Sequence, residues 1–115
     1  MVDVTRDCRM TVRCEGKIRW LSVLAIRYIE SAGRKVIVHT DNGEITYYDR
    51  MGELEETLGE RFFRIHRGYL VNLSRVTEIG GGEVTLDSGE HLLLSKYKKA
   101  AFLTAYQRHE KNLVR

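Results

Sequence analysis

The sequence predicts a mainly β domain with one short interior helix and a second helix at the C-terminus. Apolar and polar residues alternate with period two over much of the chain, and glycine-containing turn sequences separate these stretches. Helical spacing of apolar residues is confined to residues 50–58 and to the segment after Ser95. With 115 residues, 43% of them hydrophobic, no proline and no internal repeat, the chain is expected to form one domain with a substantial core.

The first half of the chain is expected to begin with two strands. Apolar residues alternate with polar ones over residues 10–14, residues 15–16 read as a turn, and Ile18 and Trp20 continue the alternation. This pattern predicts that each strand buries one face. The apolar run at residues 23–29 is short enough for a strand, or for a single helical turn that leads into one.

A hairpin is expected over residues 36–48. Residues 36–40 are rich in β-branched side chains, and residues 44–48 supply the partner strand. Asn42-Gly43 lies between them and predicts a type I′ turn, in which both central residues take a positive φ.

A short acidic helix is expected over residues 50–58. Asp49 is positioned to act as its N-cap, and Gly59 is positioned to end it. The face that we expect to be buried consists of Met51, Leu54 and Leu58.

The second half of the chain again indicates strands. Residues 62–79 alternate irregularly and are expected to end in a strand, which the glycine triplet 80–82 connects to the next one. Residues 83–86 and 90–94 predict a further hairpin about an Asp-Ser-Gly turn.

Ser95 is expected to cap a C-terminal helix over residues 96–109. The face of this helix that we expect to be buried holds Ala100, Leu103 and Tyr106. Neither helix presents an obvious face for reading a DNA groove. We therefore expect a domain over residues 10–110, preceded by a poorly ordered extension, residues 1–9, and followed by a tail, residues 111–115.

Composition and motifs exclude several classes of function. The two cysteines, Cys8 and Cys14, are too few for a disulfide framework, and the four histidines show no metal-ligand spacing, so no metal site is expected. Residues 80–83 lack the lysine and the hydroxyl residue of a phosphate-binding loop, and no nucleophile elbow occurs, so we expect neither an enzyme nor a cofactor. The chain has no run of about 18 apolar residues and no charged-then-apolar leader, which indicates a cytoplasmic protein without membrane insertion.

The net charge of +3 is unevenly distributed along the chain. Residues 41–60 carry one Lys or Arg against seven Asp or Glu, and the other segments are net positive. A basic protein that gathers its acidic residues in one segment can present a positive face to a polyanion.

Three cationic clusters lie at or beside expected turns, where side chains can meet a partner. They are Arg34-Lys35, Arg64-His66-Arg67 and Lys96-Lys98-Lys99. Guanidinium groups suit guanine edges and phosphates, whereas lysines suit phosphates as point charges. His66 could donate to DNA or pack beneath its loop, and Asn72 is expected to cap a turn.

Residues 62–73, F-F-R-I-H-R-G-Y-L-V-N-L, closely resemble the core motif of the LytTR DNA-binding domain of bacterial regulators, an aromatic residue followed by R-x-H-R-S-Y-L-V-N-L. Residues 26–31 resemble that family's D-I-x-Y-I-E-A segment. Residues 36–43 resemble its V-x-V-H-T-x-D-G hairpin, and residues 54–58 its L-x-x-L-E-x-x-L helix. The resemblance spans about residues 14–99.

This resemblance implies an elongated arrangement of small antiparallel sheets that inserts loops into successive major grooves of double-stranded DNA. By motif position, base reading maps to Arg34, Arg67 and Tyr97. Tyr97 departs from the arginine that is common at its position, and a tyrosine cannot make a bidentate contact with guanine. Gly68 replaces the family's usual serine. Phosphate or supporting contacts are expected from Lys35, Arg64, His66, Ser95, Lys96 and Lys98.

The resemblance also implies a bacterial transcriptional regulator, either the output domain of a response regulator or a short stand-alone member. Response regulators of this family bind paired direct repeats and usually carry a receiver domain, so a homodimer on DNA and a receiver outside this chain are expected. Two alternatives stay open. One is a β-rich module that binds a small anionic ligand, such as a nucleotide, through Arg61, Arg64 and Arg67. The other is a protein-interaction domain that uses the C-terminal helix.

Overall fold

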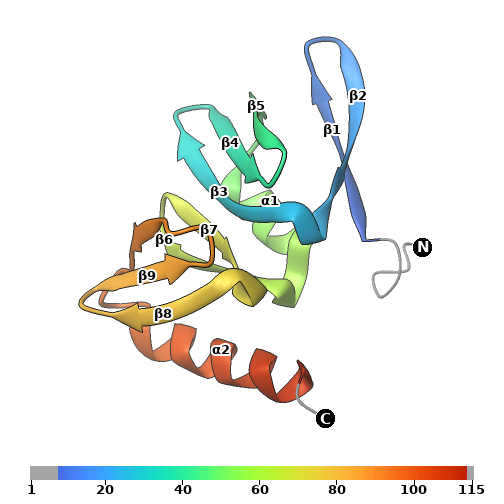
Figure 1. The fold of residues 1–115 in the computed structure, drawn as a ribbon. Coiled ribbons are helices and arrows are strands. Elements are labelled where there is room, and N and C mark those ends of the chain that lie inside the picture. Colours follow the sequence, from blue (N-terminus) through green and yellow to red (C-terminus); the bar gives the residue numbers. More distant parts are fainter. Residues whose placement is uncertain (1–7, 114–115) are drawn as a thin grey trace.

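The computed structural model describes residues 8–113, with side chains described through Glu110. The described chain folds into three antiparallel sheets and two α-helices (Figure 1), which confirms the predicted fold class. It measures 40 × 34 × 24 Å along its principal axes. Residues 1–7 of the expected extension and residues 114–115 of the expected tail lie outside the described residues, whereas residues 111–113 end the C-terminal helix.

The first sheet is a hairpin of β1 (Arg9–Cys14) and β2 (Lys17–Ser22). It projects from the body of the molecule (Figure 1). Its turn residues, Glu15 and Gly16, both take a positive φ, 53° and 75°, as a tight two-residue hairpin turn requires. The buried face of the hairpin consists of Met10, Val12 and Leu21.

The opposite face of this hairpin corrects one expectation. The alternating pattern places Ile18 and Trp20 on a buried face, but they are 58% and 62% exposed. Across the ladder they pair with Arg13 and Thr11, and residues directly opposite in antiparallel strands share a face. Because that face of β1 points to solvent, the two apolar side chains do as well. The Arg9 guanidinium lies 4.5 Å from the centre of the Trp20 ring and covers part of it.

The central sheet has five strands in the order β5-β4-β3-β7-β6. Their bounds are β3 (Ile26–Ala32), β4 (Lys35–Thr40), β5 (Gly43–Tyr48), β6 (Phe62–His66) and β7 (Tyr69–Asn72). A single 3-10 turn, η1 (Val23–Ala25), leads into β3, which is one of the two forms expected for residues 23–29. The pairing of β3 with β7 unites two hairpins that are far apart in the sequence.

The turn between β4 and β5 is not the type I′ turn expected at Asn42-Gly43. Thr40 pairs with Gly43, so the turn residues are Asp41 and Asn42, and neither takes a positive φ. Thr40 Oγ1 accepts a hydrogen bond from the Asn42 amide (3.0 Å) and donates one to the Gly43 carbonyl (2.7 Å). These bonds stabilise a turn shifted by one residue, and Gly43 alone takes a positive φ, 119°.

Helix α1 (Met51–Leu58) packs with its predicted face buried, and Gly59 ends it at a φ of 68°, as expected. The expectation that Asp49 caps the helix is wrong. Its carboxylate accepts hydrogen bonds from the Arg50 amide (2.8 Å) and from the Tyr47 hydroxyl (2.8 Å) instead. Arg50, in an extended conformation, occupies the N-cap position, and its side chain makes no capping bond.

The third sheet has the order β10-β9-β8. Its strands are β8 (Val76–Gly80), β9 (Glu83–Leu86) and β10 (His91–Leu93). The 3-10 turn η2 (Gly59–Arg61) precedes β6, and η3 (Leu73–Arg75) precedes β8. The glycine triplet makes the predicted connection, because Gly81 and Gly82 form the turn with φ values of 63° and 77°.

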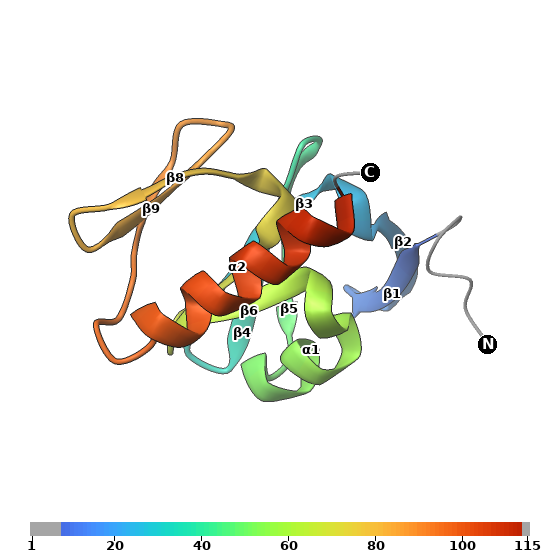
Figure 2. The ribbon, with the colours of Figure 1, turned by 90° about the horizontal axis from the view of Figure 1, so that it is seen from below.

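Helix α2 (Lys99–Leu113) runs beneath the third sheet and β6 (Figures 1 and 2). It begins at Lys99 and not at Lys96, because Ser95 organises a separate turn. The Ser95 hydroxyl accepts a hydrogen bond from the Tyr97 amide (3.3 Å), and its carbonyl accepts one from the Lys98 amide (2.9 Å).

The buried face of α2 also differs from the expected one. Phe102 is fully buried and Ala100 is exposed. Ala105 and Tyr106 are half-buried beside Phe102, so Tyr106 belongs to the buried face as expected. A later start leaves each residue at the same angle about the helix axis, so it does not explain why a different face is buried. The side that packs inward is the one that carries Phe102, because its aromatic ring buries more apolar area than the side chain of Ala100.

Two clusters of buried side chains lie on opposite faces of the central sheet. One includes Ile29 and Val38 and joins the sheet to the first hairpin and α1. The other includes Tyr28, Val71 and Phe102 and joins the sheet to the third sheet and α2. Tyr28 and Ile29 are neighbours in β3, and successive strand residues point to opposite faces. The central sheet is therefore a scaffold packed on both sides.

Asn72 fastens the end of β7 to the start of β3. Its side chain, in a residue that is 2% exposed, donates from Nδ2 to the Ile26 carbonyl (2.8 Å). Its Oδ1 accepts from the Ser74 amide (3.0 Å) and the Ser74 hydroxyl (2.8 Å) at the start of η3. These bonds confirm the expectation that Asn72 caps a turn.

Replacing Asn72 should therefore destabilise the fold. We expect Asn72→Ala to lower the free energy of unfolding by about 1–3 kcal/mol, because it leaves the buried Ile26 carbonyl without its donor. Urea denaturation followed by circular dichroism measures this. The matched control is Asn42→Ala in an exposed turn, which should change the free energy by less than about 0.5 kcal/mol. Equal effects of the two substitutions would contradict the assigned role.

Arg75 holds the third sheet against the central one. Its guanidinium lies 3.3 Å from Asp87 and also donates a hydrogen bond to the carboxylate of Asp41 in the β4–β5 turn. A second bridge joins Arg27 of β3 to Glu90, with 3.0 Å between the charged atoms. Together these contacts fix the relative orientation of the two sheets.

The Arg75 contact makes a pH-dependent contribution. The hydrogen bond from Arg75 holds the pKa of the Asp41 carboxyl below its ordinary value of 3.8. Its stabilising effect is fully present above pH 3.8 and is lost as the pH falls through the lowered folded-state pKa. In Arg75→Gln we expect the Asp41 titration to move up towards 3.8, as followed by NMR of the carboxyl carbon. An unchanged titration would show that Arg75 does not set it.

Candidate nucleic-acid interface

Three turns lie together on one side of the molecule (Figures 1 and 2). Because β3 and β7 are antiparallel, the end of β3 lies beside the start of β7, and so do the turns that follow and precede them. The Ser31 amide donates to the Gly68 carbonyl (2.9 Å), and the Ser95 amide donates to the Ile65 carbonyl (2.8 Å). These bonds join the turns into one surface. We call it the turn surface, and its turns are residues 33–34, 67–68 and 95–98.

The first turn presents two cations from the expected site. Arg34 is at its tip and is exposed, and Gly33 supports the two-residue turn with a φ of 69°. Lys35 is exposed as well, with its ammonium 4.9 Å from the centre of the Tyr48 ring. Neither cation is committed to an ion pair that would occupy it within the described part of the chain.

The second turn separates the roles of its two arginines. Arg67 is exposed at the tip. Arg64 is 28% exposed, donates to the Arg67 carbonyl (2.8 Å) and lies 3.7 Å from the carboxylate of Glu55 in α1. Arg64 therefore stabilises the turn from its protein-facing side, and Arg67 is the arginine that the turn exposes to solvent.

His66 fixes the shape of the same turn. Its Nδ1 accepts a hydrogen bond from the Gly68 amide (3.1 Å), and its ring centre lies 5.7 Å from that of Tyr69. This is the second of the two roles expected for His66, packing beneath the loop. A Cβ atom on Gly68 would lie 3.6 Å from His66 Nδ1, an ordinary contact, so the serine usual in similar sequences would fit here.

The third turn carries the most exposed aromatic residue of the interface. Tyr97 is 85% exposed, and the ammonium of Lys96 lies 5.3 Å from the centre of its ring. Lys98 is exposed beside it, and the half-buried Ser95 closes the turn with its hydroxyl. All the residues predicted for the third loop therefore belong to one turn.

A groove adjoins the turn surface where the first turn faces the start of α1. It encloses about 760 Å³ and is lined by Arg34, Arg50 and Arg64, among other residues. Sequence reasoning missed Arg50. The available signal was that Arg50 is the one cation in the acidic segment 41–60.

Sequence reasoning also did not assign His39 to the site. This residue lies in the central sheet and is 6% exposed. Its Nε2 lies 2.9 Å from Glu30, its Nδ1 lies 3.1 Å from Glu44, and its ring stacks on Tyr28 at 4.1 Å. Burial raises the pKa of Tyr28 to about 12. Tyr28 in turn meets Tyr69 edge-on at 6.1 Å, so a row of rings supports the second turn from within the sheet.

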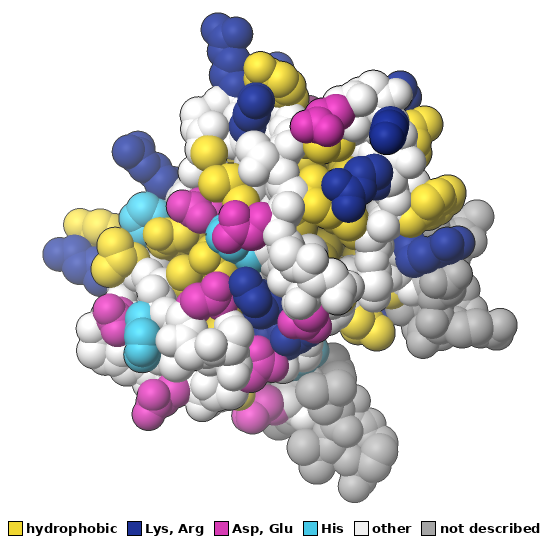
Figure 3. Space-filling view, turned by 45° about the horizontal axis from the view of Figure 1, so that its top comes forward, with side chains coloured by type: hydrophobic (Ala, Val, Ile, Leu, Met, Phe, Trp, Pro, Cys, Tyr) yellow, Lys and Arg dark blue, Asp and Glu magenta, His cyan; other side chains and the backbone are white. Residues whose placement is uncertain are grey.

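Charged side chains of both signs lie on the face drawn in Figure 3. Figure 3 shows acidic and histidine side chains over the middle and lower part of one face; several Lys and Arg side chains project from its upper and left edges, and others lie among the acidic ones. A polyanion would meet the projecting cations before it met the carboxylates.

The structure does not bring Arg61, Arg64 and Arg67 together. Arg61 precedes β6 and Arg67 follows it, so the five-residue strand separates them by roughly 20 Å. Arg64 lies between them and is directed to Arg67 and Glu55. An anion site formed by these three arginines, one of the alternatives from the sequence, therefore has no geometric support.

Among the residues that the structure describes, no three His, Cys, Asp or Glu side chains are grouped in a way that could hold a metal ion. Over the same residues, no helix combines the length and the apolar character needed to cross a membrane.

The model of the LytTr DNA-binding domain family matches residues 16–107. Since this range covers most of the chain, the chain belongs to the LytTR family, a family of DNA-binding domains found in transcriptional response regulators. The match includes all three turns of the turn surface, and it ends two residues before His109.

Individual relatives agree with this assignment. Accessory gene regulator protein A of Staphylococcus epidermidis is 34% identical over 74 residues, and that of Staphylococcus aureus is 32% identical over 79 residues. These matches cover 61% and 67% of this chain, but only 31% and 30% of the length of those proteins. A solved LytTr DNA-binding domain from Bacillus cereus has the same fold, with a TM-score of 0.73 at 20% identity over 85% of this chain and 95% of that one.

The role of His66 in shaping the second turn can be tested without DNA. His66→Phe keeps a ring against Tyr69 but removes the acceptor for the Gly68 amide, so this amide should exchange with solvent about fivefold faster. Hydrogen exchange followed by NMR measures the rate, and the Ser95 amide serves as the internal control. If the Gly68 amide exchanges at the same rate in both proteins, His66 does not hold the turn.

Proposed function

We propose that this chain binds double-stranded DNA sequence-specifically as the output domain of a bacterial transcriptional regulator, with its turn surface inserted into successive major grooves. The observation that carries the proposal is the joining of three exposed cationic turns by backbone hydrogen bonds, on a chain of a DNA-binding family. Successive major grooves on one side of DNA are about 34 Å apart. The 40 Å length of the domain is sufficient to span that distance.

Base reading falls to the exposed residues at the tips of the turns. Arg34 and Arg67 each carry a planar guanidinium that can bond both O6 and N7 of guanine. Tyr97 has a single hydroxyl and a flat ring, which suit one hydrogen bond or an apolar contact with a thymine methyl group. The third turn therefore selects bases less strictly than the first two.

Phosphate contacts fall to the neighbouring cations and the hydroxyl of the third turn. They come from Lys35, Lys96, Lys98 and Ser95. Arg64 and His66 support the surface by holding the second turn, since their polar atoms are engaged inside it. Phosphate contacts position the protein, and base contacts specify the sequence.

The length of the relatives supports a proposal about the larger assembly. The chain spans less than a third of the accessory gene regulator proteins that it matches. We propose that the regulator includes a receiver or another regulatory partner outside this chain. From the family resemblance we also propose that it binds paired direct repeats as two copies on DNA.

Selection from a random duplex library tests the proposal. The purified chain should enrich a short motif. Its affinity for that motif should fall as salt rises, with a slope of log K against log salt of about −0.9 for each phosphate contacted. Equal weak binding to selected and scrambled DNA would overturn sequence-specific recognition.

Substitution of Arg67 separates base reading from phosphate binding. We expect Arg67→Ala to cost about 1–3 kcal/mol on the selected motif and to relax one base position, because a bidentate contact is lost. Fluorescence anisotropy against single-base variants of the motif measures both effects. The matched control is Arg13→Ala, which removes an exposed arginine of the first hairpin. A uniform loss on every duplex would make Arg67 a phosphate contact instead.

A further inference from the structure

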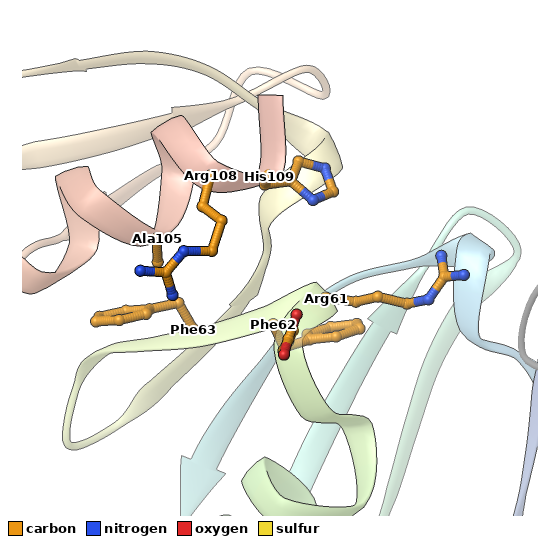
Figure 4. A pocket seen from close by; sticks show the side chains of 7 residues that line it. Arg61, Phe62, Phe63, Ala105, Arg108 and His109 are labelled. Carbon is orange, nitrogen blue, oxygen red and sulfur yellow. The ribbon is translucent and has the colours of Figure 1, made fainter. Parts of the chain in front are cut away.

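A cleft separates α2 from the start of β6, at the end of both elements that lies away from the turn surface. It encloses about 430 Å³, which is within the range of about 300–1,000 Å³ typical of small-molecule sites. Its apolar walls are Phe62, Phe63 and Ala105. Figure 4 shows Phe62 and Phe63 along the strand side and Ala105 on the helix above them.

His109 brings an unusual polar atom to this cleft. Its Nε2 is buried and has no hydrogen-bond partner among the described residues. Buried polar atoms in folded proteins are nearly always paired, so an unpaired one that borders a cleft calls for an explanation, and a ligand in the cleft is one. Burial, together with the nearby positive charge of Arg61, lowers the pKa of His109, and the carboxylate of Glu110 opposes this shift only in part.

The charges around the cleft favour an anion. Its lining includes two guanidinium groups, those of Arg61 and Arg108, and one carboxylate, that of Glu60. In Figure 4, Arg108 reaches down from α2 towards Phe63, whereas the guanidinium of Arg61 extends to the far side. Arg108 is therefore positioned to pair with a bound anion, and Arg61 adds to the positive field at longer range.

We propose that this cleft binds a small carboxylate with an apolar tail. The Arg108 guanidinium pairs with the carboxylate, His109 Nε2 donates a hydrogen bond to it, and the tail lies against Phe62, Phe63 and Ala105. Two apolar walls and few convergent polar groups are the usual composition of a small-molecule site. Binding is a property of the chain without DNA, so the inference does not rest on the proposed DNA recognition.

Titration of the full chain with a matched pair of probes tests the site. The probes are 3-phenylpropionate and its neutral analogue 3-phenylpropanamide, with hexanoate as a second carboxylate. We expect both carboxylates to shift the Ala105 and His109 resonances saturably, and the amide to bind about tenfold more weakly, since it cannot form the charge-assisted pair. On binding, the pKa of His109 should rise, because the carboxylate stabilises its protonated form.

Variants locate the binding within the cleft. Arg108→Gln should weaken the carboxylates about tenfold and leave the amide unchanged, whereas Ala105→Leu should weaken all probes by filling the cleft. Arg13→Gln on the first hairpin is the matched control and should change nothing. Thermal unfolding shows whether each variant remains folded.

Three results would overturn the inference: no saturable shift with either carboxylate, equal affinity for carboxylate and amide, or no effect of Arg108→Gln in a folded variant. DNA affinity is measured separately on the same proteins. A chain that binds the carboxylates but no DNA would refute the proposed function alone, and the converse result would refute this site alone.

Discussion

The antiparallel pairing of β3 with β7 is the constraint on which the rest of the molecule depends. It pairs Ile29 with Leu70 and places the end of one hairpin beside the start of another that lies about forty residues away in the chain. The first and second turns must then lie at the same end of the sheet. The third turn joins them through the bond between Ser95 and Ile65. The turn surface is in this sense a property of strand pairing.

Such a surface requires a rigid scaffold, because the turns themselves contain few buried contacts. The central sheet supplies it by packing an apolar cluster on each face. Polar contacts fix how the packed elements are oriented. Asn72 joins β7 to β3, and Arg75 holds the third sheet against the central one. Strand β6 begins at the cleft and ends at the turn surface, whereas helix α2 begins at the turn surface and reaches the cleft at Arg108, so the two proposed sites share structural elements but occupy opposite ends of them.

Much of the fold followed from local patterns in the sequence. Period-two alternation located most strands, the glycine triplet predicted the connection between two of them, and the apolar spacing of residues 51–58 predicted the buried face of α1. Asn72 was recognised as a turn cap from the habits of its side chain. The motif of residues 62–73 identified the family, and with it the residues of the three turns. These features depend on neighbours within a few residues, which is why sequence reading reached them.

The sequence by itself therefore determined the strands, the short helix, the family and the candidate residues at the turns. Only the tertiary structure decided which side chains face solvent and which turns meet. Ile18 and Trp20 are exposed because of their partners across the ladder, and Phe102 is buried because of the sheet above it. Arg64 supports its turn from behind because Glu55 and the Arg67 carbonyl lie within its reach. Each of these outcomes depends on contacts with residues outside the segment itself, and periodicity along one segment carries no information about them.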